Sequence, residues 1–256
     1  MRTYDRNIPP ALPARRMLDR RASNLPPVVD LRAWCGAVKD QGQEGACTAH
    51  AGTSANEWIH RRYLKSAPTF SPQYTYAKEL ILQGDFPKDE GSDGVTLCQT
   101  LVSDGCCELS LYPYIPGDIG EPTAGQDANA RKYRLGAYHG LRSSAVAQSV
   151  LGDPVPWPVA LGFTVLESFE SEEVARTGVY VPGSGGRVLG GHEVLIVGYD
   201  LGDVPTIRPA KCPPAFLIQN SWGAGWGLDG FVWMDRNVLD AVDTDLKIAH
   251  SGGPWR

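Results

Sequence analysis

The sequence predicts an α+β protein of two lobes, a helical lobe followed by a β-rich lobe, with a cleft between them. In the first half, apolar residues recur at helical spacing from Cys47 to Tyr63 and again from Ser71 to Gln83. Short apolar runs rich in β-branched residues fill the second half. Residues able to carry chemistry stand in both halves, so we expect them to meet in the groove where the lobes join.

Three segments are expected along the chain: a short basic, proline-rich N-terminal leader (1–29), the helical lobe (30–125) and the β-rich lobe (126–256). The leader carries six arginines and two aspartates, a net charge of +4, and has no sustained apolar periodicity. A segment of this composition does not fold by itself.

Composition narrows the function classes without choosing among them. The chain has 256 residues and a formal net charge of -5, which argues against nucleic acid as a partner. It lacks the run of about 18 apolar residues that a membrane span needs, so no membrane partner is expected. No apolar stretch follows the first residues, so no secretory signal is visible and a cytoplasmic location is the default expectation.

The stretch from Asp40 to Ala51 predicts a glycine turn that opens into a helix beginning at Cys47. At a helix N-terminus the backbone N–H groups lack intrahelical partners and the macrodipole is positive. This environment favours the nucleophilic thiolate and lowers the thiol pKa from its free value of about 8.5. The alternative is that Cys47 is a small buried apolar residue.

Two later segments supply partners for this cysteine. His192 heads the apolar run His192–Tyr199, as expected of a buried strand whose first residue faces a cleft. Asn220 follows a second apolar strand, Ala215–Gln219, and precedes a glycine-rich turn. Each residue alone is more often structural. Together with Cys47 they make a nucleophile, a base and an orienting amide drawn from three remote segments.

The remaining elements follow in order. A helix is expected at 71–83, where Pro72 suits the first turn, and a shorter helix at 95–103. The loose segment 115–141 is where the chain should cross between lobes. Strands are expected at 159–166, 178–181, 192–199, 215–219 and 230–234.

Four motifs occur in a fixed order between residues 29 and 234. They are Gln41-Gly42-x-x-Gly45-x-Cys47, the segment Gly91 to Tyr114, Gly191-His192, and Asn220-Ser221-Trp222-Gly223-x-Gly225-Trp226-Gly227. In these motifs the chain resembles the papain-like cysteine proteases, and most of all their bacterial, xylellain-like branch. The resemblance implies a papain-like two-lobe fold, with a helical left lobe, a β-barrel-like right lobe and the active-site cleft between them.

The resemblance also implies a peptidase that acts on peptide or protein substrates through a thioester acyl-enzyme, with no cofactor and no metal. In that family pattern Cys47 is the nucleophile, His192 the base and Asn220 the residue that orients the imidazole. The side-chain amide of Gln41 would stabilise the oxyanion together with the backbone N–H of Cys47. Trp222 would shield the contact between His192 and Asn220 from water.

Five residues are expected to bind substrate by the same resemblance. Gly91 and Ser92 correspond to the stretch whose backbone pairs with an extended substrate, while Gly191 and Trp222 flank the base and the amide. Glu193 stands where relatives line the pocket for the second residue before the cut, and would admit Arg or Lys there. The alternative is that this glutamate points into solvent or meets a structural arginine.

Three features leave alternatives open. The leader is shorter than the family's propeptide, and is either a disordered tail or an arm that docks in cis on the cleft, keeps the enzyme latent and is cut at its arginine pairs. Beyond Cys47 the chain has an odd number of cysteines (Cys35, Cys98, Cys106, Cys107 and Cys212), and Glu44 replaces a half-cystine of the family. Either one or two bridges form with a spare thiol, or none does.

Two other functions compete with the peptidase reading: a catalytically inactive papain-like scaffold used for binding, and an acyl enzyme that acts on non-protein amides. A further histidine, His50, lies one turn beyond Cys47, but no second Cys or His has the spacing of a metal site. We expect His50 to be a packing residue.

Overall fold

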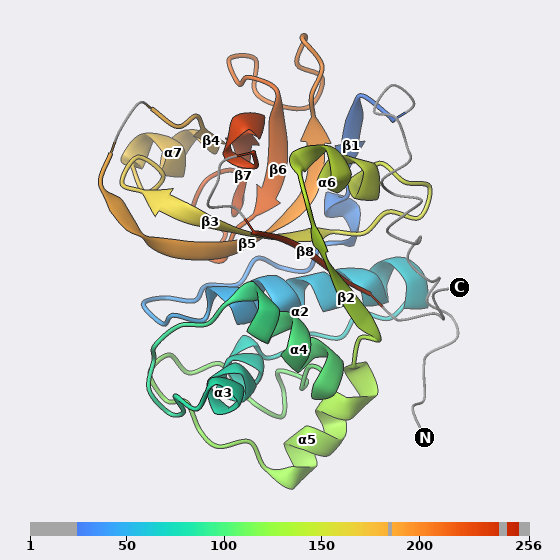
Figure 1. Ribbon diagram of the computed structural model, residues 1–256, viewed down its shortest axis with the longest axis vertical. Helices are drawn as coiled ribbons and strands as arrows, with labels where there is room; N and C mark the ends of the chain where they lie inside the picture. Colours follow the sequence, from blue (N-terminus) through green and yellow to red (C-terminus); the bar gives the residue numbers. More distant parts are fainter. Residues whose placement is uncertain (1–24, 184–185, 241–244, 251–256) are drawn as a thin grey trace.

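The structure, a computed structural model, describes residues 25–183, 186–240 and 245–250 of the chain. The helices α2 to α5 lie together in one half of the molecule, and an extended sheet fills the other half (Figure 1). The fold class is therefore α+β, as the sequence predicts. Most of the leader lies outside the described residues, so the hypothesis of a docked arm concerns a segment that the structure does not describe.

The predicted helices are confirmed. Helix α2 (Cys47–Ile59) begins at the cysteine, is buried along almost all of its length and continues as a π-helical turn (His60–Leu64). Helix α3 (Pro72–Gln83) begins where the hydroxyl of Ser71 accepts a hydrogen bond from an amide of its first turn. Helix α4 (Gly94–Ser103) is capped by Asp93 in the same way.

Three short helices were not predicted: α5 (Ala124–Ala130), α6 (Ser144–Leu151) and α7 (Glu172–Thr177). Each has eight residues or fewer, too short for a helical period to stand out, and each begins at a Ser or Thr that caps it. Helix α5 falls inside the segment 115–141 that the sequence presents as a loose crossover. The lobe boundaries placed there stay a prediction.

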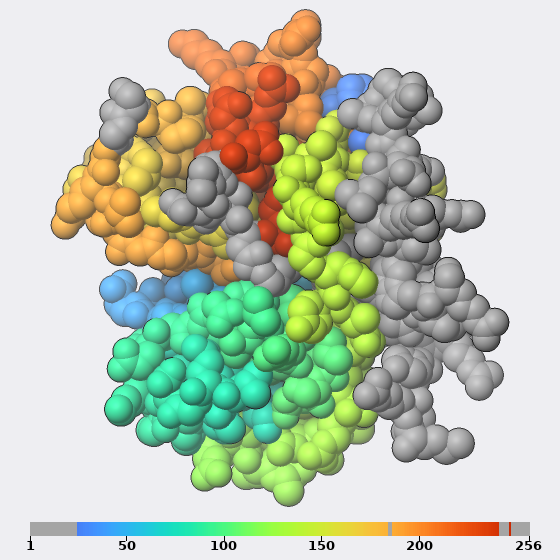
Figure 2. Space-filling view, in the orientation of Figure 1, coloured from blue at the N-terminus to red at the C-terminus, as the bar shows by residue number. Residues whose placement is uncertain are grey.

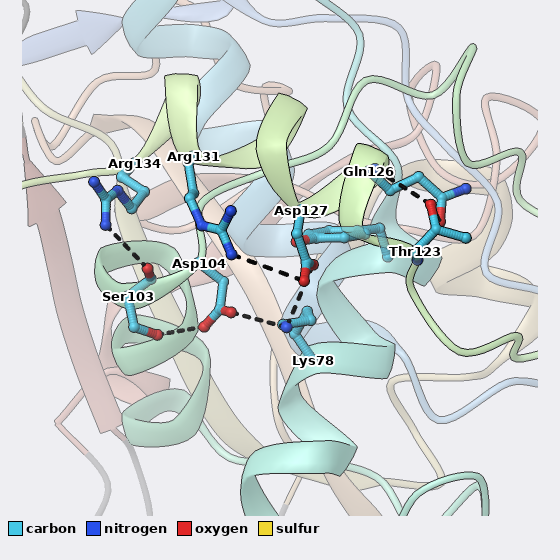
Figure 3. A network of polar contacts seen from close by, with 9 residues as sticks. Lys78, Ser103, Asp104, Thr123, Gln126, Asp127, Arg131 and Arg134 are labelled. Carbon is cyan, nitrogen blue, oxygen red and sulfur yellow. Dashed lines mark hydrogen bonds and ion pairs between the residues drawn. The ribbon is translucent and has the colours of Figure 1, made fainter.

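Ion pairs connect helix α5 to helices α3 and α4. Lys78 on α3 pairs with Asp104, at 3.0 Å, at the end of α4, and with Asp127 of α5, at 3.4 Å (Figure 3). The hydroxyl of Tyr74 donates to the same Asp127 at 2.8 Å. A single lysine thus links three helices in the half of the molecule that carries Cys47.

The other half is an eight-stranded sheet in the order β2-β8-β3-β5-β6-β7-β4, with β1 paired to β5 beside this path. All pairs are antiparallel except β4 with β7. Among the described residues nothing pairs β2 with β4, so the sheet is open rather than a closed barrel. The strands are β1 (Val28–Asp30), β2 (Ala137–Leu141), β3 (Val159–Leu166), β4 (Val179–Tyr180), β5 (Val188–Asp200), β6 (Ala215–Gln219), β7 (Phe231–Asp235) and β8 (Asp245–His250).

Strand β5 is longer than its sequence predicts. It begins at Val188, so His192 is its fifth residue and not its first. The first four residues are exposed, which is why their pattern resembles a loop, yet they pair with β3, whose Thr164 lies opposite Gly191. His192 therefore sits where an exposed stretch of the strand turns into a buried one.

All six cysteines are free thiols. Of the alternatives that the sequence leaves open, the structure shows the one without disulfides. None of the helices in the described ranges has the length and apolar character that crossing a membrane requires.

Candidate active site

The site is assembled at the meeting of the two halves. Cys47 is the first residue of α2, and His192 lies on β5, which packs against α2. Strand β6 pairs with β5 and ends at Gln219, which brings the following Asn220 beside His192. An isolated β-bridge between Asp40 and Trp222 joins the turn before α2 to the segment after β6.

The Cys47 thiol is largely buried beside the backbone of β5. Its pKa is raised to about 11, chiefly by burial and in smaller part by the carboxylates of Glu193 and Glu79. Hydrogen bonds to the sulfur from the backbone N–H groups of Glu193 and Thr48 act in the opposite direction. The prediction of a lowered thiol pKa at the helix start is therefore wrong for this resting state, because loss of solvation outweighs the amides.

His192 is held by the amide of Asn220. The imidazole Nε2 lies 2.8 Å from Asn220 Oδ1, and the backbone N–H of Ser221 donates to the same oxygen at 2.9 Å. Since this atom accepts from a backbone amide, it is the amide oxygen, and His192 Nε2 must carry the proton. The other ring nitrogen, Nδ1, is left unprotonated. Burial lowers the pKa of His192 to about 4, against the opposing effect of the Asn220 bond, so the ring is neutral.

Aromatic rings surround the imidazole. The indole of Trp222 stacks on His192 with ring centroids 4.9 Å apart, and Phe163 meets the same ring edge-on at 6.0 Å. Trp226 in turn packs edge-on against Trp222 at 5.0 Å. These rings remove water from the histidine, which is the physical cause of its low pKa.

Gln41 is fixed by Ser221. Its backbone N–H donates to the carbonyl of Ser221 at 2.8 Å, and its side-chain oxygen accepts from the Ser221 hydroxyl at 2.5 Å. Its side-chain NH₂ donates one hydrogen bond to the carbonyl of Glu44 at 2.9 Å, and no group in the described part of the chain accepts the second N–H. No role was predicted for Ser221, although its position between Asn220 and Trp222 in the motif was a signal that could have indicated one.

An open groove of about 650 Å³ adjoins the site. In Figure 2 the blue segment before α2 lies below the yellow and orange surface of the β-rich half, and the molecule is notched between them. The groove is lined by Asp40, Gln41, Gly42, Gln43, Glu44, Gly45, Val165, Glu170, Leu189, Gly190, Gly191, His192, Trp222 and Trp226. The predicted residues Gly191 and Trp222 are thus on its wall.

The other predicted substrate-binding residues lie elsewhere. Gly91 has φ of 78°, and its N–H donates to the hydroxyl of Tyr76 at 2.9 Å. It lies beside Gly45, and a side chain added at Gly91 would meet no neighbouring atom within 4 Å, so its predicted pairing with substrate stays a prediction. Ser92 follows on the same loop. Glu193 is buried and lines a small inner cavity instead of the open groove, so its predicted contact with substrate stays a prediction.

No group of three or more His, Cys, Asp or Glu side chains with the geometry of a metal site occurs in the described part of the chain. His50, the histidine one turn beyond Cys47, is buried, and its Nδ1 lies 2.9 Å from the carbonyl of Ala46.

Comparison with known proteins shows the family of the chain. A model of the papain family cysteine proteases matches residues 25–250. The chain belongs to the papain family of cysteine proteases. In this papain-family chain the match runs from the start of the described residues to the last strand, so it includes every residue of the candidate site.

Several relatives resemble this papain-family chain. The crystal structure of xylellain, a cysteine protease from Xylella fastidiosa, superposes with a TM-score of 0.77 at 26% identity, covering 90% of this chain and 88% of that one. An uncharacterized peptidase C1-like protein of Acanthamoeba polyphaga mimivirus is 28% identical over 75% of this chain and 62% of its own length. Cathepsin K of Gallus gallus is 29% identical over 85% of this chain and 61% of its own. The chain thus spans about three fifths of these two curated relatives.

Proposed function

We propose that this protein is a cysteine endopeptidase that hydrolyses peptide bonds through Cys47, His192 and Asn220. The observation that carries the proposal is the meeting of a thiol at the start of α2 with the β5 segment that bears an Asn-bound, neutral imidazole. The sulfur accepts a hydrogen bond from the backbone N–H of Glu193, the residue after His192, so the nucleophile lies against the stretch of β5 that carries the base. The groove beside them is large enough for several residues of a peptide.

The reaction begins with proton transfer. His192 Nδ1 takes the proton of Cys47, and the thiolate and imidazolium that result stabilise one another, which offsets the cost of burying each charge. The thiolate then attacks the peptide carbonyl. His192 returns the proton to the leaving amine, and water hydrolyses the thioester with the same imidazole as base. The hydrogen bond to Asn220 keeps the ring in the tautomer that this sequence of transfers requires.

Gln41 is proposed to hold the oxyanion. Its side-chain oxygen is occupied by Ser221 and one N–H by Glu44, so the amide is fixed with a single N–H left to donate. The backbone N–H of Cys47 at the helix start is the second donor. Loss of one such donor typically costs roughly 100- to 1000-fold in rate, and Gln41→Ala should show a loss of this size.

Cleavage of casein or gelatin, together with labelling by a thiol-alkylating epoxysuccinyl peptide, tests the proposal. Wild type should cleave and be labelled, whereas Cys47→Ala should do neither. Cys35→Ala is the matched control, since Cys35 is also a partly exposed thiol with a raised pKa and lies outside the site. Labelling without any cleavage of protein or peptide would favour the inactive scaffold, and turnover of small amides alone would favour an acyl enzyme for non-protein amides.

We also propose that the N-terminal leader keeps the peptidase inactive. The leader would dock in cis on the cleft, its basic arm against the acidic body of the protein. Leu25 is buried, and the carbonyls of Pro26 and Pro27 accept hydrogen bonds from Tyr199 and Leu201, so a deletion should stop at residue 24. Removing residues 1–24 should raise peptidase activity. Equal activity with and without the leader would rule out inhibition by the arm.

Specificity for Arg or Lys at the second residue before the cut is proposed to depend on Glu193. Its carboxylate contributes to the raised pKa of Cys47, which supports a position near the reacting groups. Glu193→Ala should lower the rate for an Arg-Arg dipeptide amide relative to a Leu-Arg one. An unchanged ratio would refute the assignment.

A further inference from the structure

A small cavity lies between α2 and the β5–β6 pair, apart from the open groove. His50 and Ser54 of α2 line it on one side, and Gln219 and Asn220 line it on the other. The space open to a water molecule is about 10 Å³, which is close to the minimum that holds one water. The cavity is therefore sized for a single water and too small for a larger ligand.

Among the polar side-chain atoms of residues lining this cavity, His50 Nε2, Gln219 Oε1 and Asn220 Nδ2 have no hydrogen-bond partner in the described structure. The three side chains are 2%, 4% and 4% exposed. A buried polar group without a partner costs about 1–3 kcal/mol, and buried polar atoms in folded proteins are rarely left so.

The protonation state of His50 determines whether its ring nitrogens donate or accept hydrogen bonds. Its Nδ1 faces the carbonyl of Ala46 at 2.9 Å and must carry a proton, and burial lowers the pKa of the ring to about 3. His50 Nε2 is therefore an acceptor. Gln219 Oε1 is a second acceptor and Asn220 Nδ2 a donor. Charged groups also line the cavity: Glu193, and Lys39, whose ammonium is 2.7 Å from a carboxylate oxygen of Glu57.

We infer that one water molecule in this cavity joins His50 and Gln219 to the side-chain amide of Asn220, and that His50 is thereby a positioning residue for His192. A water has two hydrogens to donate, which meet the two acceptors, and it accepts the N–H of Asn220. One water molecule therefore gives His50 Nε2, Gln219 Oε1 and Asn220 Nδ2 a hydrogen-bond partner each.

The consequence is a side-chain amide held at both ends. Asn220 Oδ1 accepts from His192 and Ser221, while its Nδ2 donates to the water. Rotation of the Asn220 amide by half a turn would break hydrogen bonds at both ends. His50 on α2, acting through the water, therefore stabilises the amide orientation that determines the His192 tautomer. The kinetic part of this inference rests on the proposed peptidase function.

Two substitutions at one position test it. His50→Phe keeps a ring and removes the acceptor, and it should lower kcat about 5- to 150-fold with little change in KM, as expected for a lost buried hydrogen bond. His50→Gln keeps an acceptor and should recover most of kcat. Should His50→Phe fail to fold, Gln219→Leu removes the other acceptor and carries the same expectation.

A readout that needs no activity is the titration of His192 by NMR in a Cys47→Ala background. The Asn220 bond raises the pKa of His192, so His50→Phe should lower that pKa, and His50→Gln should restore it. Crystals of the Cys47→Ala protein should show a water bonded to all three side chains. An unchanged kcat and pKa in His50→Phe, or direct bonding of Asn220 Nδ2 to a protein group, would overturn the inference. Failure of the wild-type protein to cleave peptides would instead count against the proposed function. The positioning role of His50 would then be tested by the titration of His192 alone.

Discussion

The imidazole of His192 and the indole of Trp222 lie nearly parallel, with planes inclined by 21° and centroids 4.9 Å apart. This stack covers one face of the histidine, while Phe163 meets its edge. Burial of the imidazole is in turn what lowers its pKa to about 4. The tryptophan is thus one of the groups whose packing keeps water from the base and the imidazole neutral.

Trp222→Leu should raise the pKa of His192 toward its ordinary value of 6.5, because water regains access to one face of the ring. NMR titration in the Cys47→Ala background measures it. Trp34→Leu is the control, since Trp34 packs on Trp58 and does not line the groove. A His192 pKa that stays near 4 in Trp222→Leu would show that residues other than Trp222 keep water from the imidazole.

The reactivity of the Cys47 thiol at neutral pH should depend on His192. In His192→Gln no imidazolium can form, and the Cys47 pKa of about 11 leaves a thiolate fraction of about 10⁻⁴ at pH 7. Alkylation by iodoacetamide should then rise about tenfold per pH unit between pH 7 and 10, whereas wild type should react rapidly at neutral pH. A variant thiol that titrates near 8.5 would contradict the burial found at this site.

Glu79 should make stability depend on pH. It is fully buried on α3, and burial raises its pKa from 4.5 to about 8, with the hydroxyl of Thr48 donating to it at 2.6 Å. Between these two pH values the folded protein keeps a proton that the unfolded chain has released, so stability falls as the pH rises through this window. Glu79→Gln should remove that loss. Urea unfolding at pH 5 and pH 8 measures it, and parallel pH profiles for wild type and variant would contradict the prediction.

Two ion pairs should differ sharply in their effect on stability. Arg208 and Asp200 are buried and paired, and Asp200 also accepts three backbone N–H groups, which together hold its pKa below the ordinary value although burial alone would raise it. Arg208→Met leaves a buried carboxylate uncompensated and should cost about 3–5 kcal/mol of unfolding free energy.

The matched control is Arg32→Met, which breaks the solvent-exposed pair with Asp30 and should cost no more than about 1 kcal/mol. Chemical unfolding of both variants at pH 7 compares them. Equal losses would mean that burial does not set the strength of these pairs.

Local sequence patterns predicted the long elements well. Helix α2 begins at Cys47 because a glycine turn precedes an uninterrupted helical pattern, and α3 begins after the cap of Ser71. The strand 192–199 was predicted too short, because the exposed residues at its start are held by pairing with β3 and not by their own apolar pattern. Strand β2 was not predicted, because it is held by pairing with β8, which is more than 100 residues away in the chain.

The sequence by itself determined which groups can react: a thiol at a helix start, a histidine in a buried strand, and an amide with the serine and tryptophan that follow it. Tertiary structure decided their states. The raised pKa of Cys47, the neutral ring of His192 and the buried surroundings of Glu193 and His50 depend on desolvation. Desolvation is a sum over neighbours that come from remote parts of the chain, so no local pattern of residues contains it.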